Sequence, residues 1–349
     1  MSKTIPAETL AKFAQSVLIV HGVPSADAHL VADSLIAAEL WGHSSHGMLR
    51  LPWYVDRIRS GAMRAVTESA TVMDHAALAI IDGNDGIGQV LTAQAVKLGV
   101  ERARAYGISA VGVRHSNHFG TAAYFTRMAA EAGCVAFLTT NASPAMAPWG
   151  GREKKVGTNP WSIAAPAGAR GIAVMDIANT AVARGKIYLA AERNENIPPG
   201  WAADGNGAPT TNANDALRGL ILPMAGHKGY VISFMMDVLA GVLTGSHFGS
   251  AVAGPYDPER RSGCGHMLIT IDIEAAMPRA DFEARMETLI EEVKMCPAAN
   301  GVQEIFFPGE IESINSIANQ CSGIEVADQT WAGLEKLASV ACPLPAYRS

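Results

Sequence analysis

The chain contains a strand-turn-helix unit that has the beginning of a dinucleotide-binding fingerprint but not its end. Ala77–Asp82 predicts a short strand, Gly86-Ile87-Gly88 a tight turn, and Gln89–Tyr106 a helix. The third glycine of a Rossmann fingerprint would follow three positions later, where this chain has Leu91. The next predicted strand ends near Arg114, where an NAD site of that type needs an acidic residue. We interpret the turn as structural, with a nucleotide contact as the alternative.

Composition limits the class of protein. The 349 residues are 49% hydrophobic and 17% charged and include 34 glycines, which is typical of a compact α/β or α+β enzyme of two or three lobes. The net charge of -6 argues against a surface for nucleic acid or anionic membrane. The five cysteines show no CxxC spacing, so we expect free thiols in a reducing cytoplasm.

The predicted elements form a helical start, a central region of strands and a helical end. Apolar spacing predicts helices over Ala7–Ile19 and Ala26–Leu40, and a third from about Arg50 to the residue before Gly61. Short β-type runs between Pro and Gly turns over Cys134–Asp176 indicate a mostly antiparallel sheet.

Three other segments carry predictions. The polar stretch Asn194–Asn214 predicts a long loop. The longest apolar run, Tyr230–Leu243, is too short to span a bilayer and predicts a buried helix. The N-terminal segment lacks the apolar core of a signal peptide, which favours a cytoplasmic location.

Two histidine pairs, His43-Ser44-Ser45-His46 and His115-Ser116-Asn117-His118, are the strongest candidates for chemistry. An imidazole can transfer a proton near neutral pH or bind a metal, so both remain open here. Arg50 and Tyr54 follow His46 by four and eight residues, and would share its helical face if the helix extended back that far. Arg50 could then bind a substrate carboxylate. The alternative is an ordinary surface arginine with a capping histidine.

Weaker candidates lie further along the chain. Gly226-His227-Lys228-Gly229 precedes an apolar helix, and such a helix N-terminus suits a phosphate or carboxylate. Asp176 ends a predicted strand and could orient a histidine, bind a ribose hydroxyl or cap the next segment. Cys264 and His266 could form half of a zinc site, but no second pair follows, so we expect no metal.

Six ordered segments resemble the signatures of the non-Rossmann malate/L-lactate dehydrogenase family, which also includes ureidoglycolate dehydrogenase, diketogulonate reductase, sulfolactate dehydrogenase and reductases of piperideine- or pyrroline-2-carboxylate. The match runs from about residue 5 to 330. The segments are GHSSHGMLRLPWYVDRIRSG, RHSNHFGTAAYF, PWGGREKKVGTNPWSIAAP, MDIANTAVARGKI, IPPGWAADGNGAPTTN and LPMAGHKGY.

The resemblance implies an NAD- or NADP-dependent oxidoreductase that transfers hydride between nicotinamide and C2 of a small 2-oxo or 2-hydroxy acid. It implies an α/β (α+β) fold with a non-Rossmann, mainly antiparallel cofactor-binding domain, a helical N-terminal region and a homodimer. From the charge and the apolar pattern we expect no nucleic-acid or membrane partner. The expected division is 1–70 for the helical region, 71–133 with 301–349 for the substrate and dimerisation domain, and 134–300 for the NAD(P)-binding domain.

The resemblance also assigns roles. His46 is expected to be the proton donor, with His118 as the second choice, and Arg50 to grip the substrate carboxylate; Tyr54 and Asp176 complete the catalytic set. Arg184 would contact a 2′-phosphate, which favours NADP. The residues expected to contact the cofactor are Ala142, Thr158, Asn159, Asp176, Ile177, Ala178, Asn179, Thr180, Arg184, His227, Lys228, Gly229, Gly309 and Glu310.

Three alternatives stay open at this point: a cyclic-imine reductase, a metal-dependent hydrolase that uses the histidine pairs with Asp176 or Asp237, and a silent small-molecule binding protein. Two departures from the family pattern, Asn179 and Val231, leave the substrate and the cofactor preference undecided.

Overall fold

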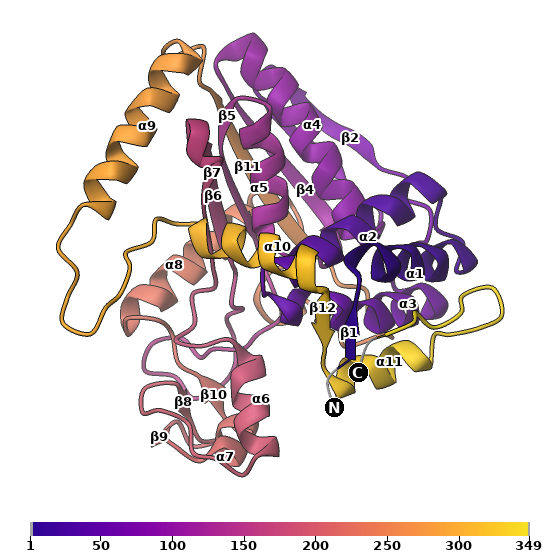
Figure 1. Ribbon diagram of the computed structural model, residues 1–349. Coiled ribbons are helices and arrows are strands. Elements are labelled where there is room, and N and C mark those ends of the chain that lie inside the picture. The colour runs from indigo at the N-terminus through magenta and orange to yellow at the C-terminus, as the bar shows by residue number, and fades with distance from the viewer. Residues whose placement is uncertain (1–2, 348–349) are drawn as a thin grey trace.

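The computed structural model describes residues 3–347, except for the side chains at positions 189 and 192 (Figure 1). The helical start is as predicted, with α1 (Ala7–Val20), α2 (Ser25–Leu40) and α3 (Leu51–Ser60). Two single 3-10 turns, η1 (Ser44–His46) and η2 (Met48–Arg50), connect α2 to α3. These helices share one apolar core with α11 (Asp328–Glu335) and with a two-stranded sheet of β1 (Lys3–Ile5) and β12 (Ile324–Val326).

A seven-stranded sheet forms the centre of the molecule, and it is mainly antiparallel as predicted, because only β3 and β4 pair in parallel. Its strands come from both sides of the boundary expected between residues 133 and 134, so one sheet contains parts of two expected domains. The division into domains stays a prediction. Its strands, in spatial order, are β2 (Ala70–His75), β3 (Leu78–Asp82), β4 (Ile108–Ser116), β11 (Cys264–Asp272), β5 (Cys134–Thr140), β6 (Trp161–Pro166) and β7 (Ile172–Ile177).

Helices cover both faces of this sheet. On one face α4 (Gly88–Tyr106) and α5 (Ala122–Glu131) lie over the sheet, where Val111 and Val113 of β4 join their apolar core (Figure 1). On the other face lies the π-helical turn η4 (Val238–Val242), which continues α8 (His227–Asp237). The side chain of Thr244 packs against Gly112, the β4 residue between those two valines, and this places the segment opposite α4.

The apolar run of α8 and η4 is not buried in this chain, so that prediction was wrong. The side packed on the rest of the chain is made of small residues, such as Gly229, Ser233 and Gly241, because the backbone there closely approaches the segments that flank the strands. The large side chains point outward and are 47–59% exposed; they are Val231, Phe234, Met235, Val242 and Leu243. The segment is therefore apolar on the side that faces away from its own sheet.

The prediction of a long loop over Asn194–Asn214 was also wrong in part, because this segment contains secondary structure. Its residues form β8 (Ala202–Ala203), β9 (Pro209–Thr210) and the start of α7 (Ala213–Arg218), with β10 (Leu220–Ile221) completing a three-stranded sheet. Asp204 Oδ1 accepts from two backbone N–H groups of the connecting turn. Ile197 and Ala202 pack with Ile187 of α6 (Arg184–Glu192), which gives this small lobe its own core.

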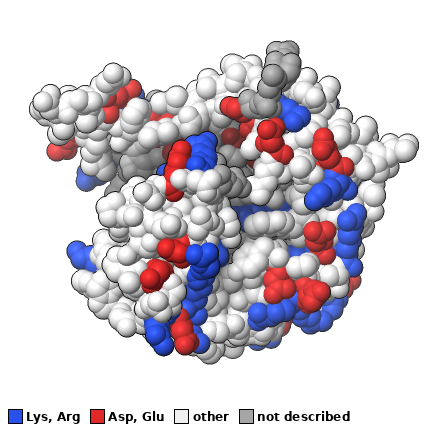
Figure 2. All heavy atoms as spheres, turned by 90° about the horizontal axis from the view of Figure 1, so that it is seen from below, with Lys and Arg blue, Asp and Glu red and all other residues white. Residues whose placement is uncertain are grey.

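The C-terminal part adds two longer helices, α9 (Arg279–Lys294) and α10 (Glu310–Ser322). Figure 1 shows α9 standing at the edge of the molecule, and within it only Ile290 is buried. Figure 2 shows acidic and basic side chains interspersed over the lower face. Within residues 3–347, no helix combines the length and the apolar content that crossing a bilayer requires.

Candidate active site

The strand order brings the predicted site residues to one edge of the seven-stranded sheet. β4 and β5 both pair antiparallel with β11, so they run in the same direction and their carboxyl ends lie at this edge. His118 follows the end of β4, and Ala142 follows the end of β5. β6 begins and β7 ends here too, which adds Asn159 and Asn179. Because strands are about 4.8 Å apart, the edge spans roughly 19 Å from β4 to β7.

His46 and His118 come from different elements and stack on each other. Their ring centroids are 5.8 Å apart and the ring planes differ by 21°. The Tyr54 hydroxyl lies 2.8 Å from His118 Nδ1, and the backbone N–H of Gly120 donates to the same nitrogen at 3.2 Å. Because an N–H can only donate, Nδ1 accepts both bonds and the neutral ring of His118 carries its proton on Nε2.

Arg50 lies beside this cluster, although not on a continuous helix with His46. Gly47 interrupts the chain between η1 and η2 with a non-helical backbone conformation, so the helix does not extend back to His46 as the spacing allowed. Arg50 Nε donates to the Ser45 carbonyl at 2.6 Å, and its guanidinium lies 4.3 Å from the centre of the Trp53 ring. These two contacts fix the plane of the guanidinium, and within residues 3–347 no hydrogen bond engages its terminal nitrogens.

Burial and neighbouring cations keep both histidines neutral. Burial first, and then the charges of Arg50 and His43, lower the pKa of His46 to about 3. Burial also holds the pKa of His118 well below its ordinary value, with Arg50 and His46 as the next causes. Burial raises the pKa of Tyr54. At neutral pH the cluster therefore holds one cation, Arg50, among uncharged groups.

The first histidine of each pair, His43 or His115, contacts a carboxylate outside the cluster of His46 and His118. His43 Nε2 is 3.3 Å from Glu312 Oε1 on α10, and His115 Nδ1 is 3.1 Å from Asp82 Oδ1 at the end of β3. Across residues 3–347, no three His, Cys, Asp or Glu side chains come together as ligands for a metal ion. Both nitrogens of His266 are bonded, to Ser116 and to Thr140, so this ring has none free for the zinc site considered above.

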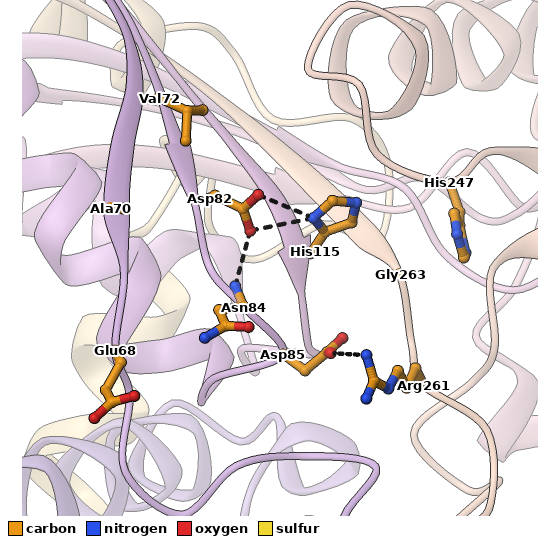
Figure 3. Close-up of a pocket in the computed structure, with 10 residues that line it drawn as sticks. All are labelled: Glu68, Ala70, Val72, Asp82, Asn84, Asp85, His115, His247, Arg261 and Gly263. Carbon is orange, nitrogen blue, oxygen red and sulfur yellow. Dashed lines mark hydrogen bonds and ion pairs between the residues drawn. The ribbon is translucent and has the colours of Figure 1, made fainter.

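His115 lines a separate cavity of about 450 Å³ (Figure 3). Asp82 contacts His115, and an ion pair of 3.0 Å joins Asp85 to Arg261 on the opposite wall. His247 faces His115 with ring centroids 6.4 Å apart. These polar groups are paired with each other, and the cavity does not include the stacked histidines.

Asp176 is placed at the start of a helix. Its Oδ2 accepts from the backbone N–H of Ala123 at 2.8 Å, in the first turn of α5. Burial raises the pKa of this carboxyl group, and the bond from Ala123 opposes the rise. Asp176 therefore caps α5, and among the described residues it makes no hydrogen bond to His46 or His118.

A second group of predicted residues forms one network of amide side chains. Asn159 is fully buried; its Oδ1 accepts from Ala142 N and its Nδ2 donates to the Ser233 carbonyl, both at 2.8 Å. Asn179 Nδ2 donates to the Asn159 carbonyl at 2.7 Å. A Cβ on Gly229 would lie 2.5 Å from the Asn179 carbonyl oxygen, so α8 begins in direct contact with this network.

The beginning of α8 is exposed and basic. Gly226, with φ 66°, precedes the helix without any side-chain cap, and both His227 and Lys228 are exposed. A second pair of cations lies at the start of α6, where burial and the nearby charge of Arg184 lower the pKa of Lys154. Both places suit phosphate groups, because one is a helix N-terminus with an exposed lysine and the other has two neighbouring cations.

The remaining predicted cofactor residues support these segments. Ile177 and Ala178 are half-buried at the end of β7, and Thr180 forms an isolated bridge with Pro223. Gly309 has φ 93° and packs against Val174 of β7. Glu310 is engaged by Lys294 Nζ at 2.5 Å and by the backbone N–H of Phe307.

Sequence reasoning missed several residues around the histidines. The carboxylate of Glu39 accepts from Met48 N at 2.7 Å, and burial raises its pKa to about 7. The guanidinium of Arg57, only 1% exposed, donates to Asn117 Oδ1 at 3.0 Å. Gln89 is fully buried beside Tyr54. Buried polar side chains in apolar helices were the available signal, but their partners are distant in sequence.

Comparison with known proteins identifies the family of this chain. The family model for malate/L-lactate dehydrogenase matches residues 5–335. The L-sulfolactate dehydrogenase of Methanothermobacter thermautotrophicus is 39% identical over 97% of this chain and 96% of its own. The ureidoglycolate dehydrogenase (NAD(+)) of Escherichia coli O157:H7 is 32% identical over 94% and 93%.

A solved structure shows the same fold. The sulfolactate dehydrogenase of Methanocaldococcus jannaschii superposes with a TM-score of 0.91 at 35% identity, covering 97% of this chain and 96% of that one. The resemblance seen in the six segments is thereby confirmed across nearly the whole length. The chain belongs to the malate/L-lactate dehydrogenase family, and it is an oxidoreductase of the hydroxy-acid dehydrogenase type.

Proposed function

We propose that the protein reduces the 2-oxo group of a small 2-oxo acid to the 2-hydroxy acid, and catalyses the reverse oxidation, with NADH or NADPH. The observation that carries this proposal is the half-buried cluster in which His46 stacks on His118 beside Arg50 and the buried Tyr54. The names of the sulfolactate and ureidoglycolate dehydrogenases support a hydroxy acid as substrate. When bound, the nicotinamide would supply or accept the hydride.

Arg50 would bind the substrate carboxylate. Its Nε is engaged by the Ser45 carbonyl, and its terminal nitrogens can form two parallel bonds to a carboxylate. Stacking on Trp53 keeps the guanidinium in one plane, so the carboxylate is held in one orientation. This orientation places C2 at a fixed position relative to the two histidines.

His46 would exchange the proton at the C2 oxygen. Reduction adds one hydride to C2 and one proton to the oxygen, so a proton donor is required. In the free protein burial and the Arg50 charge keep His46 neutral. A bound carboxylate offsets the charge of Arg50, which raises the pKa of His46 and lets it carry the proton. His118, with Nδ1 filled by Tyr54 and Gly120, would hold the same oxygen through its Nε2–H.

The residues present fit a phosphate-bearing cofactor. Lys228 and the uncapped N-terminus of α8 offer donors for a diphosphate, and they adjoin the amide network of Asn159 and Asn179. Arg184, next to Lys154, would bind the 2′-phosphate that distinguishes NADP from NAD. The NAD(+) in the name of the ureidoglycolate relative supports the same class of cofactor.

We also propose that the protein is a homodimer in which α8 and η4 pack against a second copy. The exposed residues Phe234, Met235 and Leu243 form an apolar surface of the kind that is buried in oligomers. Light scattering after size exclusion should give twice the mass of one chain, and Phe234→Asp should give a monomer. A monomeric wild-type protein would contradict this part of the proposal.

The test of the activity is the oxidation of NADH and NADPH with pyruvate, oxaloacetate, 3-sulfopyruvate and piperideine-2-carboxylate. Arg50→Lys should lower kcat/KM by roughly tenfold to a hundredfold, because an ammonium cannot bind a carboxylate through two parallel bonds. The matched control is Arg59→Lys on the following helix α3, where Arg59 contacts surface groups at His21 and Asp56. Silence of the wild-type protein across this panel would refute the proposed function.

A further inference from the structure

Glu39 carries a buried carboxyl group that the proposed reaction does not use. It is the second-to-last residue of α2 and is only 7% exposed. Its Oε1 accepts a hydrogen bond from Met48 N at 2.7 Å, and within residues 3–347 no ion pair engages this carboxyl group. Burying a carboxyl group away from water is unfavourable, so its place in the fold calls for a reason.

The carboxyl group lies at the joint between the two 3-10 turns that carry His46 and Arg50. Gly47 separates η1 from η2, and a Cβ added to it would lie 2.3 Å from Glu39 Oε1, so the carboxyl group lies directly against the backbone there. Gly47 N donates to the Ser44 carbonyl at 3.2 Å, and Arg50 N donates to the Gly47 carbonyl at 2.9 Å. Glu39 therefore contacts the chain at the point where both turns meet.

No continuous helix holds this joint. The backbone of Gly47 is non-helical, with ψ −137°, and Met48 is the first residue of η2, so its N–H has no partner within its own turn. Glu39 supplies that partner from α2, a helix whose buried residues belong to the apolar core of the helical region. The side chain of Met48 is buried in the same core, and the bond from Glu39 fixes its backbone as well.

We propose that Glu39 is a positioning residue, which sets the spacing between His46 and Arg50 by holding the backbone of Gly47 and Met48 between them. This inference rests on the proposed function, in which Arg50 binds the C1 carboxylate and His46 exchanges the proton at the C2 oxygen. C1 and C2 are joined by one bond, so the two protein groups must match a fixed spacing in the substrate. Glu39 acts through the backbone and does not touch the substrate.

The reach of the side chain, and not its charge, is the property that this role requires. The N–H of Met48 can donate to a carboxylate, to a protonated carboxyl group or to an amide oxygen. Burial raises the pKa of Glu39 to about 7, so both protonation states occur near neutral pH, and either can accept the bond. Glutamine has the same length as glutamate, whereas aspartate is shorter by one methylene group.

The experiment compares Glu39→Gln, Glu39→Asp and Glu39→Leu, with the 2-oxo acid of the panel above that the wild-type protein reduces fastest. We expect Glu39→Gln to keep kcat and KM within about threefold, because its amide oxygen accepts the same bond. Glu39→Asp and Glu39→Leu should lower kcat by about tenfold to a hundredfold, since a misplacement of about 1 Å can cost about a hundredfold in rate. Fluorescence titration with NADH or NADPH should give the wild-type dissociation constant in all three variants.

The control is Ser34→Ala in the same helix. Ser34 is 4% exposed and donates to the Val31 carbonyl at 2.8 Å, so this change removes a buried hydrogen bond within α2. It should keep the wild-type kcat and KM, because the joint between η1 and η2 is left intact. A fall in kcat as large as that of Glu39→Asp would show that any loss of stability in α2 has this effect, and would overturn the inference.

The comparison of aspartate with glutamine decides the rest. Wild-type kcat in Glu39→Asp would overturn the inference, and so would equal losses in Glu39→Asp and Glu39→Gln, because reach would then not be the property that matters. If Glu39→Leu fails to fold, these two variants still give the answer. An inactive wild-type protein would instead refute the proposed function, and this inference with it, so the two failures are distinguishable.

Discussion

The hydroxyl of Tyr54 lies 2.8 Å from Nδ1 of His118 and connects helix α3 to the segment that follows strand β4. Tyr54 is only 2% exposed, so this bond is shielded from water. Together with the N–H of Gly120, it determines which nitrogen of His118 carries the proton. A residue on the helical start of the chain thereby sets the tautomer of a residue at the sheet edge.

Removing this hydroxyl should slow the reaction more than it weakens binding. In Tyr54→Phe, His118 keeps only the Gly120 bond, and its ring is less firmly oriented toward the substrate oxygen. We expect kcat to fall about tenfold with a change in KM of less than about threefold, since one neutral hydrogen bond contributes about 1 kcal/mol. Steady-state kinetics at saturating cofactor measure both quantities.

The matched control is Tyr124→Phe. The Tyr124 hydroxyl donates to Asp33 near the surface and lies outside the histidine cluster. This variant should keep the wild-type kcat. A Tyr54→Phe enzyme with an unchanged kcat would show that the Tyr54 bond has no part in the reaction.

The cofactor preference can be tested at the start of α6. Arg184 should contribute to NADPH binding through a charge-assisted bond to the 2′-phosphate, a group that NADH lacks. We expect Arg184→Ala to lower kcat/KM for NADPH by about tenfold or more and for NADH by less than about threefold.

Lys186→Ala serves as the control, because it removes a cation from the exposed side of the same helix. Equal kcat/KM losses for NADPH and NADH in Arg184→Ala would place the arginine outside the 2′-phosphate site. A larger loss of kcat/KM for NADPH than for NADH in Lys186→Ala would show instead that removing any cation from this helix weakens NADPH use.

The candidate site residues to which the sequence alone could point are those whose signal is local. The two histidine pairs, Arg50 and the basic helix start at His227 and Lys228 are short patterns with a physical meaning of their own. The family resemblance added the roles of residues such as Asn179, which spacing alone does not identify. The helices were predicted well because their apolar period is also local.

What the sequence could not predict depends on contacts between distant segments. His46 and His118 stack because η1 and the end of β4 meet, and no pattern within either segment shows this. Gln89 lies in a helix whose sequence pattern is ordinary, and only the structure shows that the first turn of this helix lies against the backbone of His118. The apolar run of α8 was expected to be buried, yet small residues such as Gly229 and Ser233 make its packed side.

Gly229 provides a test of that packing. A Cβ at this position would lie 2.5 Å from the Asn179 carbonyl oxygen and 2.6 Å from that of Met224, both backbone atoms that cannot turn away. We expect Gly229→Ala to lower the free energy of unfolding by about 1–3 kcal/mol and to weaken cofactor binding, because α8 must move off the amide network. Urea unfolding and cofactor fluorescence titration measure the two effects.

Gly185→Ala is the control for that substitution. Gly185 lies in α6, and nothing lies within 4 Å of a Cβ added there. Alanine should be neutral or stabilise by up to about 1 kcal/mol, since it restricts the unfolded chain. If Gly229→Ala were as stable as the wild type, α8 would not be in tight contact with Asn179.

The pH dependence of stability should reveal the buried His266. This ring is 1% exposed and joins two strands through bonds to Ser116 and Thr140. Burial lowers its pKa from 6.5 to about 3, so between these values the unfolded chain binds a proton that the folded protein does not. Its contribution to stability is therefore complete above pH 6.5 and is lost as the pH falls toward 3.

His266→Gln removes this titration and keeps polar atoms in place. Urea unfolding from pH 7.5 to pH 4.5 should show a decline in stability for the wild type and a shallower decline for the variant, because a tenfold difference in proton affinity corresponds to about 1.4 kcal/mol. His46 and His118 titrate in the same direction, so some decline should remain in the variant. Parallel curves for the two proteins would show that His266 binds its proton equally well in the folded and unfolded states.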